Sequence, residues 1–271
     1  MSNKITMQPK IGMSFIGPRP LTILTTIDSK ENVTSMTAAL TMPASINPPL
    51  LILGISPQRQ TMKNIVKNGE IVLNIPSYSI AKQAWIVGMN LPNGIKLDVA
   101  GLTTTPSIEI KPPIINECYI NYECEVVNLQ QPGDQMIITV KPIVMHIDLT
   151  LKNMIQEKQG KKSNSLFDNY KDIRKKMKHI YFAGFSGEPL GMDIGLLEEK
   201  DKRVGGVPPF NQSKKWFGEA TGRGILSPSE SETLKQLCQQ WKKHQNPEEN
   251  KDIRKKLIVE FKNFFNNLKI T

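Results

Sequence analysis

Four segments near the start of the chain decide its fold class: PRPLTILTTI (18–27), VTSMTAALTM (33–42), LLILGI (50–55) and EIVLNI (70–75). Apolar, threonine and β-branched residues dominate each of them, and turn residues such as Asp28-Ser29 and Asn47-Pro48 separate them. Runs of this composition between turn signals are typical of strands. We therefore predict strands over 21–27, 33–42, 50–55 and 70–75.

One short helix is expected between the last two of these strands. Thr61 is a suitable N-cap, and Gly69 can end the helix in the left-handed conformation. A second short helix is predicted over 81–89. Residues 92–115, rich in Pro, Gly and Thr, indicate a loop with one short strand.

Two long Val/Ile-rich segments follow, 117–128 and 136–151, and the turn 130–134 joins them as antiparallel strands. Strands dominate, and strands and helices do not alternate regularly. The sequence therefore predicts a mainly β protein with minor α content, as a closed antiparallel barrel rather than a doubly wound sheet.

The character of the chain changes near residue 152. Residues 1–151 hold 11 Lys and Arg against 10 Asp and Glu, whereas residues 152–271 hold 24 against 15. Ser227-Pro228-Ser229-Glu230 reads as a capping box that begins a helix, and a second amphipathic helix follows. We predict a barrel domain over 1–152 and a basic, partly helical C-terminal extension over 153–271 of unknown role.

Composition excludes several classes of protein. No apolar run approaches the roughly 18 residues that cross a bilayer, and no secretory signal is recognisable at the N-terminus. Three cysteines do not make a disulfide framework, so we expect a cytoplasmic protein. A basic tail can meet nucleic acid, but solvated lysine faces on helices explain it as well. We do not expect a nucleic-acid, membrane or metal partner.

Familiar catalytic signatures are missing. No Gly-x-Gly-x-x-Gly follows a strand. Position 162 is Lys where a P-loop needs Ser or Thr, and Glu188 stands where a nucleophile elbow needs Gly. These departures argue against Rossmann, P-loop and Ser-His-Asp hydrolase chemistry.

A possible phosphate seat remains where the loop Ser56-Pro-Gln-Arg59-Gln-Thr61 runs into the predicted helix. Free backbone N–H groups and the helix dipole favour an anion there, and Arg59 adds a bidentate cation. The alternative stays open that Thr61 merely caps the helix.

The ordered set of motifs over residues 15–151 resembles the flavin reductase-like family of FMN-binding split barrels. The matching elements are Pro20 to Thr26, Asn32-Val33 with Ser35, Pro48-Pro49-Leu50, Thr61 to Ile65, Ile71 to Asn74, Lys96 to Thr103, Glu123-Cys124 and Val144 to His146. The C-terminal tail is longer than the usual ending of that family.

The resemblance implies a split β-barrel with a helical C-terminal extension, FMN as cofactor, NAD(P)H as co-substrate and a homodimer. It places the flavin ring at Ser35, Met36, Thr37 and Ala38, and the phosphate at Ser56, Arg59, Thr61 and Asn64. It sets His146 beside the nicotinamide or substrate, although His146 can equally be a satisfied histidine on a barrel strand.

The implied activity is that of an NAD(P)H:flavin reductase, which takes hydride at flavin N5 and passes electrons onward. The acceptor could be a protein such as a monooxygenase component. Two alternatives remain: a flavoprotein that uses bound FMN on a specific organic substrate, and a non-catalytic FMN-binding or interaction protein.

Overall fold

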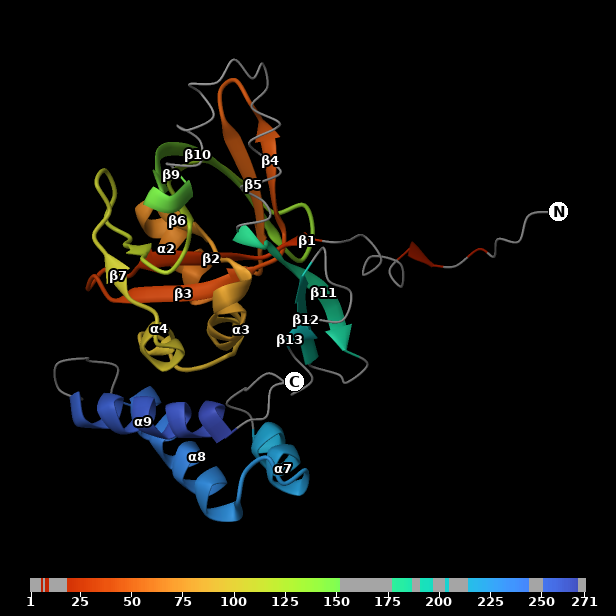
Figure 1. Cartoon of the computed structure of the whole chain (residues 1–271), viewed down its shortest axis with the longest axis vertical. Coiled ribbons are helices and arrows are strands. Elements are labelled where there is room, and N and C mark those ends of the chain that lie inside the picture. Colours follow the sequence, from red (N-terminus) through yellow and green to blue (C-terminus); the bar gives the residue numbers. More distant parts are fainter. Residues whose placement is uncertain are drawn as a thin grey trace.

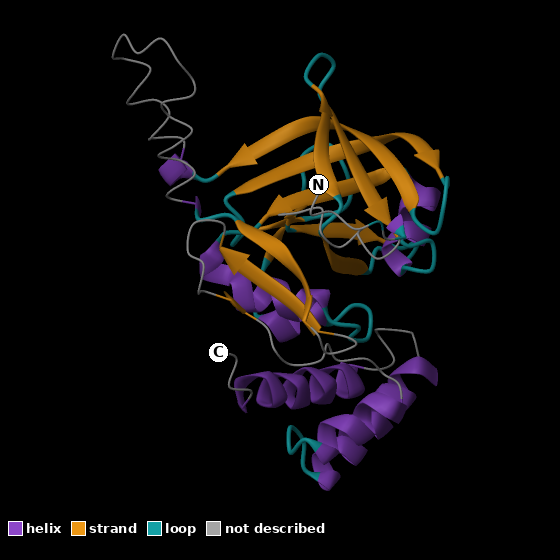
Figure 2. Ribbon diagram, turned by 90° about the vertical axis from the view of Figure 1, so that its right-hand side faces the viewer, coloured by secondary structure: helices purple, strands orange, loops and turns teal. Residues whose placement is uncertain are grey.

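The computed structural model describes residues 6, 8, 9, 19–151, 177–186, 191–196, 203–204, 214–243 and 251–267. A seven-stranded antiparallel sheet curls into a barrel (Figures 1 and 2). The strands lie in the order β3 (Val33–Ala38), β2 (Thr22–Ile27), β6 (Glu70–Ile75), β9 (Ile120–Gln130), β10 (Met136–Ile147), β5 (Leu50–Ile55) and β4 (Thr41–Ser45). The predicted class, a split β-barrel with a helical C-terminal region, is confirmed.

The single strand predicted over 33–42 is wrong, because it is two strands on opposite edges of the sheet. The chain breaks at Ala39–Leu40, pairs β3 with β2, and then pairs β4 with β5. The carbonyl of Leu40 accepts a 2.8 Å hydrogen bond from the Gly54 N–H. A Cβ on Gly54 would lie 2.9 Å from the Leu40 side chain, so glycine permits this close crossing. The crossing leaves β3 and β4 as the two edges that split the barrel.

Helix α2 (Gln60–Asn68) packs on β2 and β3. The predicted cap at Thr61 is wrong: the N-cap lies two residues earlier, at Arg59, which makes no side-chain cap hydrogen bond. Thr61 lies inside the first turn and is buried. Gly69 ends the helix in the left-handed conformation, as predicted, and its N–H bonds the Ile65 carbonyl at 2.9 Å. The N-terminus of α2 is therefore not closed by a side chain.

A helical layer covers one side of the barrel. The short turn η2 (Tyr78–Ile80) leads into α3 (Ala81–Gly88), which confirms the predicted second helix. Helix α4 (Lys96–Ala100) was not predicted, since its five residues lie in a segment rich in Pro, Gly and Thr. The short strands β7 (Thr104–Thr105) and β8 (Ile114–Ile115) pair after it.

Three C-terminal helices pack beneath α3 and α4 (Figure 1). They are α7 (Lys214–Gly222), α8 (Pro228–Lys243) and α9 (Lys251–Asn267). The capping box of α8 is confirmed, because the Ser227 N–H donates to the Glu230 carboxylate at 2.8 Å. Trp85 of α3 meets Phe265 of α9 edge to face, with ring centroids 5.9 Å apart. One apolar core therefore joins the barrel side of the chain to the C-terminal helices.

The predicted C-terminal extension, expected to be partly helical, also contains strands. A second sheet has the strand order β1 (Arg19–Pro20), β11 (Ile180–Ser186), β12 (Gly191–Leu196) and β13 (Arg203–Val204). Next to it, the Leu21 N–H donates to the Ile180 carbonyl. The domain boundary predicted after residue 152 lies at the start of a stretch outside the described residues. Of the helices in the described part of the chain, none is long and apolar enough to span a membrane.

Candidate functional site

A cavity of about 1290 Å³ opens between the barrel, the α3–α4 region and the C-terminal helices. One wall is the end of the β2–β3 hairpin, and the N-terminus of α2 adds Gln60. A second wall is the loop before α4 together with α4 itself, and a third is the facing ends of α8 and α9. The charged, polar and aromatic side chains that line the cavity include Asp28, Glu31, Ser35, Lys96, Trp241, Lys242, Lys251 and Arg254.

Lys96 is the most unusual group of this cavity. It begins α4, its side chain is buried at 8 % exposure, and its ammonium reaches one backbone oxygen, that of Val87, at 3.4 Å. Within the described residues it has no carboxylate partner. Burial and, to a smaller extent, the positive charge of Arg59 together lower the pKa of Lys96 to about 7. A buried cation without a counter-ion, at the edge of a cavity, is a site for an anion.

The predicted phosphate residues gather around the open N-terminus of α2. Arg59 is exposed and acts electrostatically on Lys96, which lies in the cavity wall. The Asn64 amide donates to the Thr26 hydroxyl at 3.1 Å and accepts from Gln60 at 2.9 Å, so it ties α2 to β2. Ser56 bonds the side chain of Gln58 instead of a residue of the cavity. Thr61 is buried within the first turn of α2.

The predicted ring residues follow one another along the edge strand β3. Ser35 is 3 % exposed and lines the cavity. Met36 and Thr37 are half-buried, Ala38 is buried, and none of the three is part of the cavity lining. Among the strands of the described residues, β3 pairs with β2 alone, so its other edge has backbone groups that no described strand bonds.

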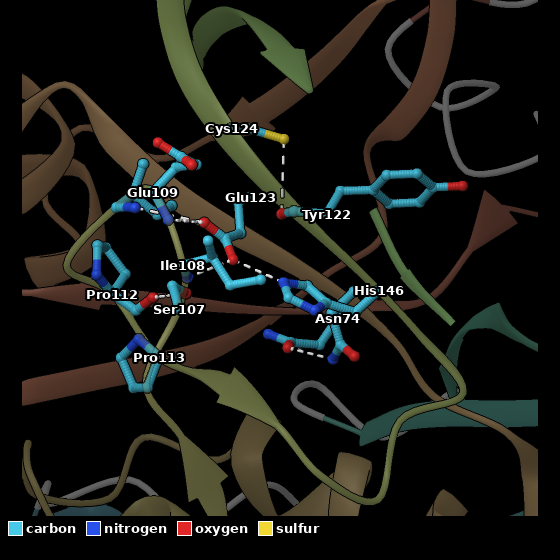
Figure 3. A network of polar contacts seen from close by, with 12 residues as sticks. Asn74, Ser107, Ile108, Glu109, Pro112, Pro113, Tyr122, Glu123, Cys124 and His146 are labelled. Atoms are coloured by element: carbon cyan, nitrogen blue, oxygen red, sulfur yellow. Dashed lines mark hydrogen bonds and ion pairs between the residues drawn. The ribbon is translucent and has the colours of Figure 1, made fainter. Parts of the chain in front are cut away.

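His146 lies apart from this cavity, on β10, in the network of Figure 3. Its Nε2 lies 2.6 Å from a carboxylate oxygen of Glu123. Glu123 is fully buried and also accepts the N–H groups of Ile108, Glu109 and Ile110. Burial alone would raise the pKa of Glu123, but these hydrogen bonds and His146 hold it below its ordinary value. The pair clamps the loop before β8 onto the barrel.

Sequence reasoning missed several residues that line the cavity. Lys96 lies in the Lys-Leu-x-x-x-Gly-Leu-Thr stretch of the family resemblance, and a lone lysine before a Gly-terminated helical turn is the signal that marks it in the sequence. Trp241, Lys242, Lys251 and Arg254 gave no signal of this kind, because only the docking of α8 and α9 brings them to the cavity. No group of three or more His, Cys, Asp or Glu that could hold a metal ion occurs among the described residues.

An uncharacterized protein of Pyrococcus abyssi is 35 % identical over 97 residues, a match that spans 36 % of this chain and 56 % of the relative. The chain thus covers little more than half the length of that relative.

Two solved structures share the fold. Nitrilotriacetate monooxygenase component B from Bacillus cereus has a TM-score of 0.58 at 18 % identity and covers 74 % of this chain and all of its own. Flavoredoxin from Methanosarcina acetivorans has a TM-score of 0.55 at 22 % identity and covers 74 % of this chain and 95 % of its own. The family model of the flavin reductase like domain matches residues 14–162, more than half of the chain. The chain therefore belongs to the flavin reductase like domain family.

Proposed function

We propose that the protein is an FMN-dependent oxidoreductase that acts as an NAD(P)H:flavin reductase and passes electrons onward. One observation carries the proposal: the buried Lys96, which has no carboxylate partner among the described residues, lies in a cavity that Ser35 and the open end of α2 also line. The cavity therefore offers a cation for a phosphate and a strand edge for a planar ring, the two features that FMN binding requires.

Lys96 and Arg59 hold the phosphate in this proposal. Their positive charges lie close enough for Arg59 to lower the pKa of Lys96, so each destabilises the other in the absence of an anion. The N-terminus of α2, which lacks a side-chain cap, adds backbone N–H groups. We keep Ser56, Thr61 and Asn64 as the residues that shape this end of the site.

The free edge of β3 orients the ring through Ser35, Met36, Thr37 and Ala38. FMN held there would supply the redox chemistry, the acceptance of a hydride from the reduced nicotinamide. The chain's own task is to bind, to orient and to exclude water. Trp241, at 7 % exposure, closes part of the cavity against solvent.

His146 is proposed to act on the nicotinamide or substrate side. The bond to Glu123 fixes the orientation of its ring, as a carboxylate partner does for a working histidine. The substitution His146→Asn should lower the turnover rate without changing FMN affinity. Equal loss of FMN binding, or unchanged turnover, would assign His146 to the structural clamp alone.

The same proposal includes a homodimer and a cytoplasmic setting. Leu40, Met42 and Ile46, on and around β4, are exposed at 43 %, 57 % and 92 %, and this apolar edge suits a second copy. The described cysteines, Cys118, Cys124 and Cys238, are free thiols. Because component B of a monooxygenase shares the fold, another monooxygenase component is a candidate acceptor protein.

The test is to load the purified protein with FMN and mix it with NADH or NADPH in the absence of oxygen. Rapid bleaching of the visible flavin absorbance is the expected result. A yellow protein that ignores both nucleotides would overturn the reductase and leave flavin binding intact. A protein that cannot be loaded with FMN would overturn the whole proposal.

A second candidate is a flavoprotein that uses bound FMN on a specific organic substrate. The C-terminal helices favour it, because they lie outside the residues that match the family and yet wall the cavity. Bleaching by NAD(P)H that persists until one organic compound is added would favour this function over release of electrons to free flavin.

A further inference from the structure

The cavity is larger than one ligand requires. Pockets for single small molecules enclose about 300–1,000 Å³, whereas this one encloses about 1290 Å³. The proposed FMN would use the end near β3, α2 and Lys96. The wall made by α8 and α9 then faces the remaining space, which has room for part of a second ligand.

The helical hairpin α8–α9 holds its side chains in fixed positions. Trp241 of α8 and Leu257 and Phe261 of α9 are buried in the core shared with α3 and α4. Arg254 donates to the Asp98 carboxylate at 2.6 Å and to the Gly94 carbonyl at 3.1 Å. These contacts fix the end of the hairpin that lines the cavity, so ligand groups bound there would meet a preorganised surface.

The hairpin presents unpaired positive charge. Lys242 and Lys251 both line the cavity and are exposed, and neither forms an ion pair with a described carboxylate. Arg254 is engaged with Asp98 and does not count as free charge. The hairpin end of the cavity therefore offers two lysines to an anion.

The opposite wall carries negative charge. Asp28 and Glu31, at the β2–β3 turn, also line the cavity. Asp28 accepts the backbone N–H groups of Lys30 and Asn32 and the amide of Asn32, which hold its carboxylate in place. A polyanionic ligand is thus repelled from the β2–β3 turn and attracted to the lysines of α8 and α9.

We propose that Lys242 and Lys251 bind the phosphates of the nicotinamide dinucleotide that reduces the flavin. The C-terminal helices are then the donor-binding wall of the enzyme, and the lysines determine affinity for the donor rather than for FMN. This inference rests on the proposed reductase function and names the part of the chain that recognises its donor.

The experiment measures equilibrium binding of oxidised NAD⁺ and NADP⁺ to the FMN-loaded protein by calorimetry, which avoids turnover. The variant is Lys242→Gln with Lys251→Gln. The matched control is Lys243→Gln with Lys255→Gln, which removes two exposed lysines of the same helices that do not line the cavity. FMN affinity is measured on each protein by fluorescence titration, and folding by thermal unfolding.

The expected result is a loss of nucleotide affinity of about tenfold or more for the first pair, because two charge-assisted contacts to phosphate are removed, with FMN affinity and unfolding midpoint unchanged. The control pair should lose less than threefold. Equal losses in both pairs, no loss in the first, or a loss of FMN affinity instead would overturn the inference. A wild-type protein that binds FMN but neither nucleotide would overturn it and leave flavin binding standing, whereas failure to bind FMN would refute the proposed function itself.

Discussion

The Arg254 guanidinium of α9 lies 2.6 Å from the Asp98 carboxylate of α4, and it bonds the Gly94 carbonyl as well. These contacts bracket Lys96, the buried cation of the cavity. The last helix of the chain is thereby connected to the segment that we propose holds the FMN phosphate. The extension is part of the architecture of the site and not a separate appendage.

Replacing Arg254 by Met should lower stability only modestly. The side chains of Arg254 and Asp98 are 36 % and 44 % exposed, so solvent and salt screen their attraction, and we expect a loss of about 0.5–1 kcal/mol. Urea unfolding at low and high salt measures it, with exposed Lys255→Met on the same helix as control. An unchanged midpoint, or the same loss in the control, would show that apolar packing alone docks α9.

Lys96→Met should separate stability from function. The free protein should gain on the order of 2 kcal/mol, because a buried cation without a counter-ion is replaced by an apolar chain of similar length. FMN affinity should fall about tenfold or more, because the phosphate loses that cation. Thermal unfolding without ligand and fluorescence titration with FMN give the two values. A destabilised variant that binds FMN normally would contradict both parts.

The pH dependence of FMN binding should reveal the same lysine. The pKa of Lys96 is about 7 in the folded protein against 10.5 in an exposed lysine, so the unfolded chain binds more protons between these values. Stability of the free protein should therefore rise with pH in that window, by up to about 1.4 kcal/mol per pH unit. FMN favours the protonated lysine, so its affinity should fall as pH rises above 7.

Calorimetry in buffers of different ionisation enthalpy should detect proton uptake on FMN binding near pH 8. Lys96→Met, compared with wild type at each pH, should abolish both the uptake and the stability slope that belongs to this residue. Identical pH profiles for the two proteins would refute the assignment.

Arg59→Ala should weaken FMN binding by about 1.5–3 kcal/mol, the contribution of a hydrogen bond to a charged group. Arg59 is exposed at the start of α2, so folding should not suffer. Lys63→Ala, an exposed cation one turn further along α2, is the matched control. Unchanged affinity by fluorescence titration would remove Arg59 from the site.

Glu123→Gln should destabilise the protein by about 2–3 kcal/mol. A fully buried carboxylate accepts backbone N–H groups and His146 there, and the NH₂ of an amide would face donors. Since the pKa of Glu123 is lowered on folding, its contribution is present above its ordinary value of 4.5 and is lost as pH falls through the lower folded value. Acid unfolding of the variant and the wild type should therefore converge at low pH.

Much of the barrel could be predicted from the sequence. The strand 50–55 is a continuous apolar run, and the strand 70–75 is mostly apolar, so their local pattern predicts them. The helix ends at Gly69, as the left-handed preference of glycine requires. The strand over 33–42 failed because its apolar pattern continues across Ala39 and Leu40. The break between β3 and β4 is set by tertiary pairing: β4 pairs with β5, and Gly54 leaves room for the Leu40 side chain at the crossing.

The sequence by itself determined the fold class and the family resemblance, because hydrophobic periodicity and turn chemistry act over a few residues. It also predicted Arg59 and Ser35 as residues of the FMN site. Tertiary structure alone decided which groups share the cavity. Lys96 and Arg254 are 158 positions apart in the sequence. Both line the cavity only because apolar burial docks α9 against α4. Long-range packing of that kind leaves no local pattern in the chain.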